Sequence, residues 1–342
     1  EHEGMLDSEL AAAVAGGVTS LVCPPDTDPV LDEPGLVEML RFKAEKLNRS
    51  KVMPLGALTR GLKGEVLTEM VQLTGATPVI VPCNEADGFK LTAQALAAAI
   101  SPHTRWLILN SPSNPTGAVY SKSELVALAD VLLANPKVLV LSDDIYEHLT
   151  FDGLPFHTIA QVEPRLRERT LTMNGVSKAY AMTGWRIGFG TGPSWLLEAM
   201  ETLQGQQTSG ASSISQHAAL AALSGPQEFV HETRKAFQRR RDKVVTRINA
   251  IEGLRCSSPA GAFYAFVACE SLIGKTTTAG TLLQSDEDVA LALLDEHAVA
   301  TVHGSAFGLG PYLRLAYALD DDSLDMACNA IENFCNSLCN AV

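Results

Sequence analysis

Short apolar runs rich in β-branched residues alternate with segments whose apolar residues recur at helical spacing. Strands are predicted at residues 18–22, 52–58, 77–81, 106–109, 138–141, 169–173 and 186–190. Helices are predicted at residues 7–15, 34–48, 64–73, 91–100 and 122–133. This alternation predicts an α/β fold with a mostly parallel sheet and right-handed crossovers. Because the strands are apolar throughout, helices are expected on both faces of the sheet.

The pattern changes after about residue 225, where one long helix is predicted at residues 226–251. Strand-like runs (FYAFVAC and LRLAYA), a helix at 286–297 and a final helix follow, and together they predict a smaller α+β domain. The expected parts are residues 1–75, a large domain at 76–225 and a small C-terminal domain at 226–342. The basic run Arg239-Arg240-Arg241 is interpreted as a solvated helix face, with contacts between subunits as the alternative.

Composition narrows the classes of function. The 342 residues are 46% hydrophobic and carry a net charge of -13. That charge argues against nucleic-acid binding by a broad basic surface and against adhesion to an anionic membrane. No apolar run reaches the ~18 residues that a membrane span needs. No signal peptide is visible. The scattered, odd number of cysteines fits a reduced cytoplasm best, so a cytoplasmic protein is expected.

Seven cysteines are scattered along the chain without a CxxC pair, which predicts neither a disulfide framework nor a zinc site. Cys328, Cys335 and Cys339 recur at the spacing of one helix face. Small buried thiols explain them better than metal ligands, and no metal is expected.

Three polar loops each follow a predicted strand: SPSNPTG at residues 111–117, SDDIYEH at 142–148 and NGVSKAYAMTGWRIG at 174–188. Ligands bind at the carboxyl ends of the strands in an open parallel sheet. The three loops are therefore expected to meet at one pocket, although they are far apart in the sequence.

The residue types in these loops suit pyridoxal phosphate. Lys178 can hold the cofactor as an imine and move a proton at the substrate α-carbon. Asp143 can pair with the pyridine nitrogen, so that the ring stays protonated. Tyr146 and Asn114 can donate to the phenolate oxygen. The alternatives are a surface lysine, an ordinary turn at Asn114, a helix N-cap at Asp143 and simple packing of Tyr146.

Two further residues suit the phosphate of that cofactor. Ser177 precedes the lysine, and Arg186 can offer the bidentate fork of its guanidinium. Each assignment has a simpler structural explanation by itself. Jointly, in this order and each after a strand, the residues favour the cofactor site.

Residues from about 76 to 342 resemble a class I aminotransferase of fold type I, in the aspartate/aromatic branch. The runs SPSNPTGAVYS, SDDIYEHL and VSKAYAMTGWRIG carry this resemblance. It implies the roles given above and adds Arg314, in PYLRLAYA, as the residue that binds the substrate α-carboxylate. It also implies ping-pong transfer between an amino acid and a 2-oxo acid, with 2-oxoglutarate as the acceptor, in a homodimer with its active site at the subunit interface.

Residues 1–75 resemble instead a fragment of a dihydroorotase-like amidohydrolase, through the run EHEGMLDSELAAAVAGGVTSLVCPPDTDPVLDEPGLVEML. In that family the metal-binding HxH motif would lie before residue 1 and the other metal ligands beyond this segment, and Asp26 stands where the family has a substrate-binding asparagine. The fragment alone is therefore not expected to hydrolyse anything. The join is expected near residues 73–79. In an aminotransferase, a glycine-rich turn and a ring-stacking aromatic residue would precede it. Neither is found in residues 1–75, whose one aromatic residue is Phe42. Without the backbone donors of that turn at a helix N-terminus, weaker phosphate binding is expected.

Three alternatives to an active aminotransferase follow. One is a chimeric or truncated protein with impaired or absent activity. The second is a lyase or decarboxylase that uses the same cofactor on the same fold. The third, a dihydroorotase-type hydrolase or its assembly partner, rests on residues 1–75 alone.

Overall fold

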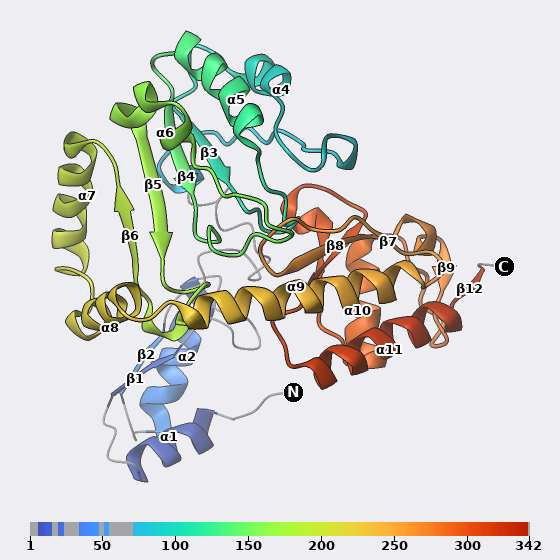
Figure 1. The fold of residues 1–342 in the computed structure, drawn as a ribbon. Helices are drawn as coiled ribbons and strands as arrows, with labels where there is room; N and C mark the ends of the chain where they lie inside the picture. Colours follow the sequence, from blue (N-terminus) through green and yellow to red (C-terminus); the bar gives the residue numbers. More distant parts are fainter. Residues whose placement is uncertain (1–5, 16–19, 24–33, 48–50, 55–70, 341–342) are drawn as a thin grey trace. The chain divides into compact units, whose positions relative to one another are not determined.

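The computed structural model describes residues 6–15, 20–23, 34–47, 51–54 and 71–340 (Figure 1). The chain divides into two compact units, Glu1–Val79 and Ile80–Val342. The predicted helix at 64–73 lies outside the described residues except for residues 71–73. Also outside them are residues 18–19 and 55–58, which belong to the first two predicted strands.

The first unit contains a strand–helix–strand motif. Helix α1 (Leu6–Ala15) is followed by β1 (Ser20–Cys23), α2 (Pro34–Leu47) and β2 (Lys51–Pro54). Strands β1 and β2 pair in parallel, with Ser20 opposite Lys51. Because parallel neighbours need a crossover, α2 makes the connection that the alternating pattern predicts.

The strand predicted at residues 77–81 is wrong, because these residues have no regular secondary structure. Val79 and Ile80 are 69% and 59% exposed. An apolar β-branched run favours a strand only where a neighbouring strand takes its backbone hydrogen bonds.

The first sheet of the second unit has the order β3-β4-β5-β6. Its strands are β3 (Trp106–Asn110), β4 (Leu139–Asp143), β5 (Thr170–Gly175) and β6 (Gly188–Thr191). The first three are parallel, whereas β6 runs antiparallel to β5. The mixed, mostly parallel sheet confirms the α/β fold class.

One face of this sheet packs on a buried apolar cluster. The helices of this layer are α4 (Ala93–Ala99), α5 (Lys122–Ala134), α6 (Ile159–Val162) and the 3-10 helix η3 (Pro164–Arg169). Leu132 of α5 and Val140 of β4 are both fully buried in that cluster. Helix α5 begins with a capping box, in which the Ser121 and Glu124 side chains each accept from the other residue's backbone N–H.

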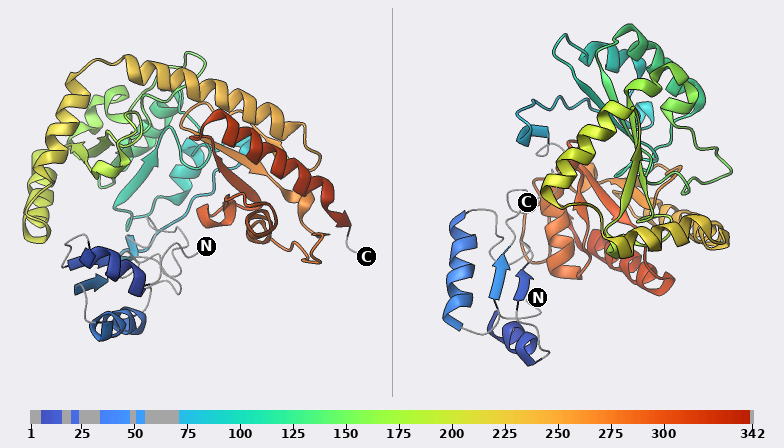
Figure 2. Two further views of the ribbon diagram at one scale, coloured as in Figure 1. Left: turned by 90° about the horizontal axis from the view of Figure 1, so that it is seen from below. Right: turned by 90° about the vertical axis from the view of Figure 1, so that its left-hand side faces the viewer.

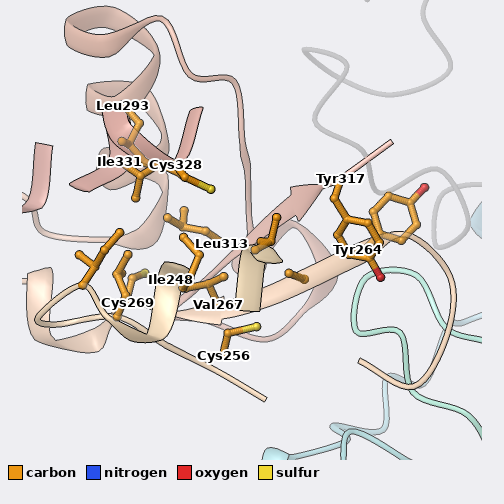
Figure 3. Packing of buried hydrophobic residues seen from close by; sticks show 14 of the residues in the cluster. Ile248, Cys256, Tyr264, Val267, Cys269, Leu293, Leu313, Tyr317, Cys328 and Ile331 are labelled. Atoms are coloured by element: carbon orange, nitrogen blue, oxygen red, sulfur yellow. The ribbon is translucent and has the colours of Figure 1, made fainter. Parts of the chain in front are cut away.

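The second sheet is antiparallel, with the order β10-β11-β8-β7. Its strands are β7 (Arg255–Cys256), β8 (Tyr264–Ala268), β10 (Val302–His303) and β11 (Tyr312–Ala316). Helices α9 (Glu228–Asn249), α10 (Asp286–His297) and α11 (Asp321–Ser337) pack with it. Helices α9 and α11 lie side by side (Figure 2). Figure 3 shows the cluster that this layer buries, with Ile248, Leu313 and Ile331 inside it.

Further elements complete the second unit. Helices α7 (Ser194–Gln207) and α8 (Ser213–Ser224) were not predicted, and all of α7 is at least partly exposed. Two further strands, β9 (Lys275–Thr276) and β12 (Cys339–Asn340), pair with each other. The described residues also form the 3-10 helices η2 (Glu85–Asp87), η4 (Thr183–Trp185), η5 (Glu270–Leu272) and η6 (Gly304–Phe307).

The cysteine prediction is correct for two of the three C-terminal thiols. Cys328 and Cys335 are buried on α11, but this helix ends at Ser337 and Cys339 is exposed beyond it. The i, i+7, i+11 spacing assumed one continuous helix. The six cysteines whose side chains the structure describes are all free thiols.

The interpretation of the basic run as a solvated face is wrong for Arg241, which is 3% exposed. Its guanidinium donates to both carboxylate oxygens of Asp152, at 2.7 and 2.9 Å, and to the Pro259 carbonyl at 3.0 Å. Arg240 pairs with Asp321 on α11, while Arg239 is exposed. Spacing along the sequence did not reveal this, because Asp152 comes from the loop after β4.

We expect Arg241→Met to lower the free energy of unfolding by about 1–3 kcal/mol, since the buried Pro259 carbonyl loses its charged donor while the half-exposed Asp152 regains water. Urea denaturation followed by circular dichroism measures this loss. Arg239→Met in the same run is the control and should stay within about 0.5 kcal/mol of the parent protein. Equal effects of the two substitutions would contradict the assignment.

Candidate active site

The three polar loops follow three adjacent parallel strands, so they leave the sheet at the same edge (Figure 1). Asn110 and Asp143 are paired in the register at the ends of β3 and β4. The Asn110 amide nitrogen donates to the Asp143 carbonyl at 3.0 Å, and its amide oxygen accepts from the Asn114 N–H at 2.8 Å. This asparagine therefore connects the first loop to the end of the second strand.

The first loop also rests on the turn before β8. Gly117 has φ +68°, and a Cβ there would lie 2.5 Å from the Pro259 Cβ. The Gly261 N–H donates to the Gly117 carbonyl at 2.9 Å. Only glycine combines this backbone conformation with such a close approach. The contact brings the second sheet to the edge where the three loops meet.

Lys178 lies in the turn after β5 and is half-buried. Its Nζ is 5.7 Å from the centroid of the Tyr146 ring and 5.9 Å from that of Phe263. Burial lowers the pKa of this amine, and the positive charges of Arg186 and Arg314 lower it further, whereas the Asp143 carboxylate acts in the opposite direction. A larger fraction of the amine is therefore neutral, as a nucleophile or a base requires.

Asp143 is the last residue of β4. Burial raises the pKa of its carboxyl group, while a hydrogen bond from the Ile145 N–H and the charge of Lys178 oppose the rise. No helix begins here, since residues 145–148 form a turn, so the N-cap interpretation is wrong. Asp144 is more deeply buried, which raises the pKa of its carboxyl to about 6, and it accepts from the Ser142 hydroxyl at 2.7 Å.

Tyr146 and Arg314 are linked through a residue that the sequence did not single out, Tyr264. The Tyr146 and Tyr264 hydroxyl oxygens are 3.0 Å apart in a buried position. The Arg314 guanidinium lies 4.8 Å from the Tyr264 ring centroid, and its Nη1 donates to the Asn114 amide oxygen at 3.0 Å. Arg314 Nε is buried without a hydrogen-bond partner among the described residues, so it can still donate to an acceptor such as a carboxylate.

The two residues predicted to bind the phosphate, Ser177 and Arg186, are less tightly held than Tyr146 and Arg314. Arg186 is exposed at the end of η4, and its Nη1 donates to the Thr183 carbonyl at 3.0 Å. Its charge nevertheless acts on Lys178, which places the two side chains in one electrostatic environment. Ser177 is half-buried next to that lysine.

Sequence reasoning missed Asn110, Phe263, Tyr264 and Phe307. Asn110 carried a local signal, because it is the polar end of an apolar strand directly before the first loop. The three aromatic residues carried none, since aromatic side chains in FYAFVAC and GSAFG are typical of cores. Only the pairing of β8 with β11 places Tyr264 near Arg314.

Several other kinds of site find no support in the part of the chain that the structure describes. A cavity of about 440 Å³ is lined by residues that include Glu147, His148 and Arg234, and one of about 150 Å³ by residues that include Glu85, Lys90 and Pro259. Lys178 lines neither of them. No group of three or more His, Cys, Asp or Glu side chains could hold a metal ion among the described residues. Nor is any described helix both long and apolar enough to cross a membrane.

Comparison with known proteins identifies the class. Residues 66–331 match the family model "Aminotransferase class I and II", so the chain belongs to this family. It is a pyridoxal-phosphate-dependent aminotransferase, and the fold-type resemblance of residues 76–342 is confirmed.

The relatives are close in sequence. The chain is 54% identical over 269 residues to a probable aspartate/prephenate aminotransferase of Rhizobium leguminosarum. The aligned residues cover 79% of this chain and 67% of the relative. It is also 54% identical over 270 residues to the aspartate/prephenate aminotransferase of Cereibacter sphaeroides, covering 79% and 68%. The chain thus spans about two thirds of the length of these relatives.

The fold agrees with solved structures. The crystal structure of the aspartate aminotransferase from Rhizobium meliloti superposes with a TM-score of 0.77 at 38% identity, covering 99% of this chain and 98% of that chain. The relatives are named aminotransferases, so a lyase or decarboxylase is not favoured, and nothing in them supports the expectation of impaired activity.

We expect Arg186→Gln to raise the pKa of Lys178, because it removes a positive charge that disfavours the protonated amine. At a given pH, less of the amine would then be neutral. Carbon-13 NMR of the reductively methylated, cofactor-free protein, assigned with Lys178→Ala, measures this titration. Arg105→Gln, at an exposed arginine before β3, is the control and should leave it unchanged. An unchanged or lowered pKa in Arg186→Gln would contradict the arrangement.

Proposed function

We propose that the chain transfers an amino group from an amino acid of aspartate or aromatic type to a 2-oxo acid, with Lys178 as the residue that bonds the cofactor. The observation that carries this proposal is the setting of Lys178. Its amine has a lowered pKa and shares one electrostatic environment with Asp143, Arg186 and Arg314 at the carboxyl edge of a parallel sheet. This environment suits a reactive amine beside two anionic groups, a phosphate and a carboxylate.

The residues present fit pyridoxal 5′-phosphate. Bound there, it would supply an electron sink for the charge that develops at the substrate α-carbon. Asp143 would hold the pyridine nitrogen protonated, and Tyr146 with Asn114 would donate to the phenolate oxygen. Ser177 and Arg186 would donate to the phosphate, for which the exposed guanidinium has free donors.

The chain's own groups would then act on the substrate. Arg314 would bind the α-carboxylate through donors that Asn114 leaves available, including the buried Nε. The amine of Lys178, once free, would take the proton from the α-carbon of the amino acid. In the second half of the reaction it would give a proton to the α-carbon of the amino acid that forms from the 2-oxo acid. A half-buried amine with a lowered pKa is suited to this, since it is neutral at lower pH than an exposed lysine.

Adding pyridoxal phosphate to the purified protein should produce a visible absorption band that depends on Lys178. Lys178→Ala should abolish this band, whereas Lys137→Ala, at an exposed lysine, should retain it. An amino acid should bleach the band and a 2-oxo acid should restore it, with aspartate, glutamate and phenylalanine compared as donors. Loss of the band in both variants, or bleaching that no oxo acid reverses, would refute the proposal.

We further propose that the chain is a cytoplasmic homodimer. Support comes from large apolar side chains that are exposed on α7 and α8, including Trp195, Leu203, Ile214 and Leu220. Apolar exposure of this kind is typical of interaction surfaces. Sedimentation velocity on the cofactor-loaded protein tests the dimer, and a monomer at all concentrations would exclude it.

For the domain organisation we propose residues 1–75 as a dihydroorotase-like segment, 76–225 as the cofactor-binding domain and 226–342 as the small domain. The family match begins at residue 66, and the first compact unit ends at Val79, close to the expected join. A sequencing read of the source DNA across the codons for residues 73–79 tests whether the join is natural.

A further inference from the structure

We propose that Tyr264 is a positioning residue for the transfer reaction, which holds Tyr146 with its hydroxyl group and Arg314 with its ring. This inference deepens the proposed function and rests on it. Tyr264 would touch neither substrate nor cofactor in this role. It would instead couple the group assigned to the phenolate oxygen with the group assigned to the substrate carboxylate.

Strand pairing places Tyr264 beside Arg314. In the antiparallel ladder of β8 and β11, Arg314 is opposite Phe266 and Ala316 is opposite Tyr264. Paired residues project from the same face, and side chains two positions along the neighbouring strand remain within reach of an aromatic ring. The Tyr264 ring therefore lies diagonally across from Arg314, with the guanidinium carbon 4.8 Å from its centroid.

The ring confines the guanidinium on one side. The Phe307 ring, from η6, also packs on the guanidinium, with its centroid 5.0 Å from the same carbon. Asn114 accepts from Nη1. A flexible arginine held by two rings and one hydrogen bond presents its remaining donors in a restricted direction. Removal of the Tyr264 ring would leave the charge but widen the range of orientations of the fork.

The hydroxyl group of Tyr264 holds Tyr146. Tyr264 is 7% exposed and Tyr146 is 3% exposed, so water has little access to their hydroxyl pair. When Tyr264 donates to Tyr146, the proton of Tyr146 is free to be donated elsewhere. Burial raises the pKa of Tyr146, and the Tyr264 hydroxyl adds to this effect, so Tyr146 stays a donor rather than a phenolate.

Sequence context and packing keep Tyr264 in place. It is the first residue of β8 and lies at one end of the apolar cluster, beside Tyr317 (Figure 3). The Phe263 ring centroid is 4.7 Å from its own. Tyr317 is fully buried in the same cluster, and among the described residues its hydroxyl donates one long hydrogen bond, to the Ala262 carbonyl at 3.5 Å, so it offers a matched control.

The experiment compares Tyr264→Phe, Tyr264→Leu and Tyr317→Phe in the cofactor-loaded protein. Binding is measured with succinate and 3-phenylpropionate, two unreactive carboxylates of aspartate and phenylalanine type, and turnover with the matching amino acids. Tyr264→Phe should lower kcat about tenfold with the Kd of the carboxylate within about twofold, since only a hydrogen bond is lost. Tyr264→Leu should lower kcat similarly and also raise that Kd about tenfold.

Tyr317→Phe should change neither quantity by more than about twofold. If Tyr264→Phe leaves kcat unchanged, or if Tyr264→Leu leaves the Kd unchanged, the positioning role is overturned while the proposed function stands. Should Tyr264→Leu fail to fold, the separation of kcat from Kd in Tyr264→Phe decides the matter. A parent protein that neither shows the Lys178-dependent band nor binds either carboxylate would overturn the proposed function and this inference with it.

Discussion

The contact between the loop after β3 and the turn before β8 is the constraint on which the rest of the site depends. The Gly261 N–H donates to the Gly117 carbonyl. The same turn is also bonded to the segment after β4, because the Ala262 N–H donates to the Leu149 carbonyl and the Phe151 N–H donates to the Ala260 carbonyl. A side chain at either glycine would collide with backbone or proline atoms. The two sheets therefore meet at a fixed place, and residues of the second can complete a pocket begun by the first.

Charge is arranged unevenly around that meeting point. Lys178 lies near two arginines and one carboxylate, so the local balance is positive in a chain of net charge -13. This balance suits anionic ligands, while the rest of the surface repels them only weakly at physiological ionic strength. Partial burial strengthens both effects, because a less polar surrounding screens charges less than water does.

The same local physics explains which predicted residues are tightly held. Tyr264 and a hydrogen bond hold Tyr146, Asn114 and Arg314 together, whereas the Arg186 side chain donates to a carbonyl of its own turn. The groups assigned to the phenolate oxygen and to the substrate carboxylate are thus preorganised by the protein. The exposed arginine keeps its donors available, and a phosphate would restrict it on binding.

The sequence alone determined the alternation of strands and helices, the three loops and the chemistry of their residues, because periodicity, turn residues and side-chain type are local properties. It failed at residues 77–81, where apolar character did not make a strand, and at Arg241, whose partner lies in the loop after β4. Only the tertiary structure decided that Tyr264 lies between Tyr146 and Arg314. That position depends on strand register and on the contact between two sheets, and both join residues that are distant in the chain.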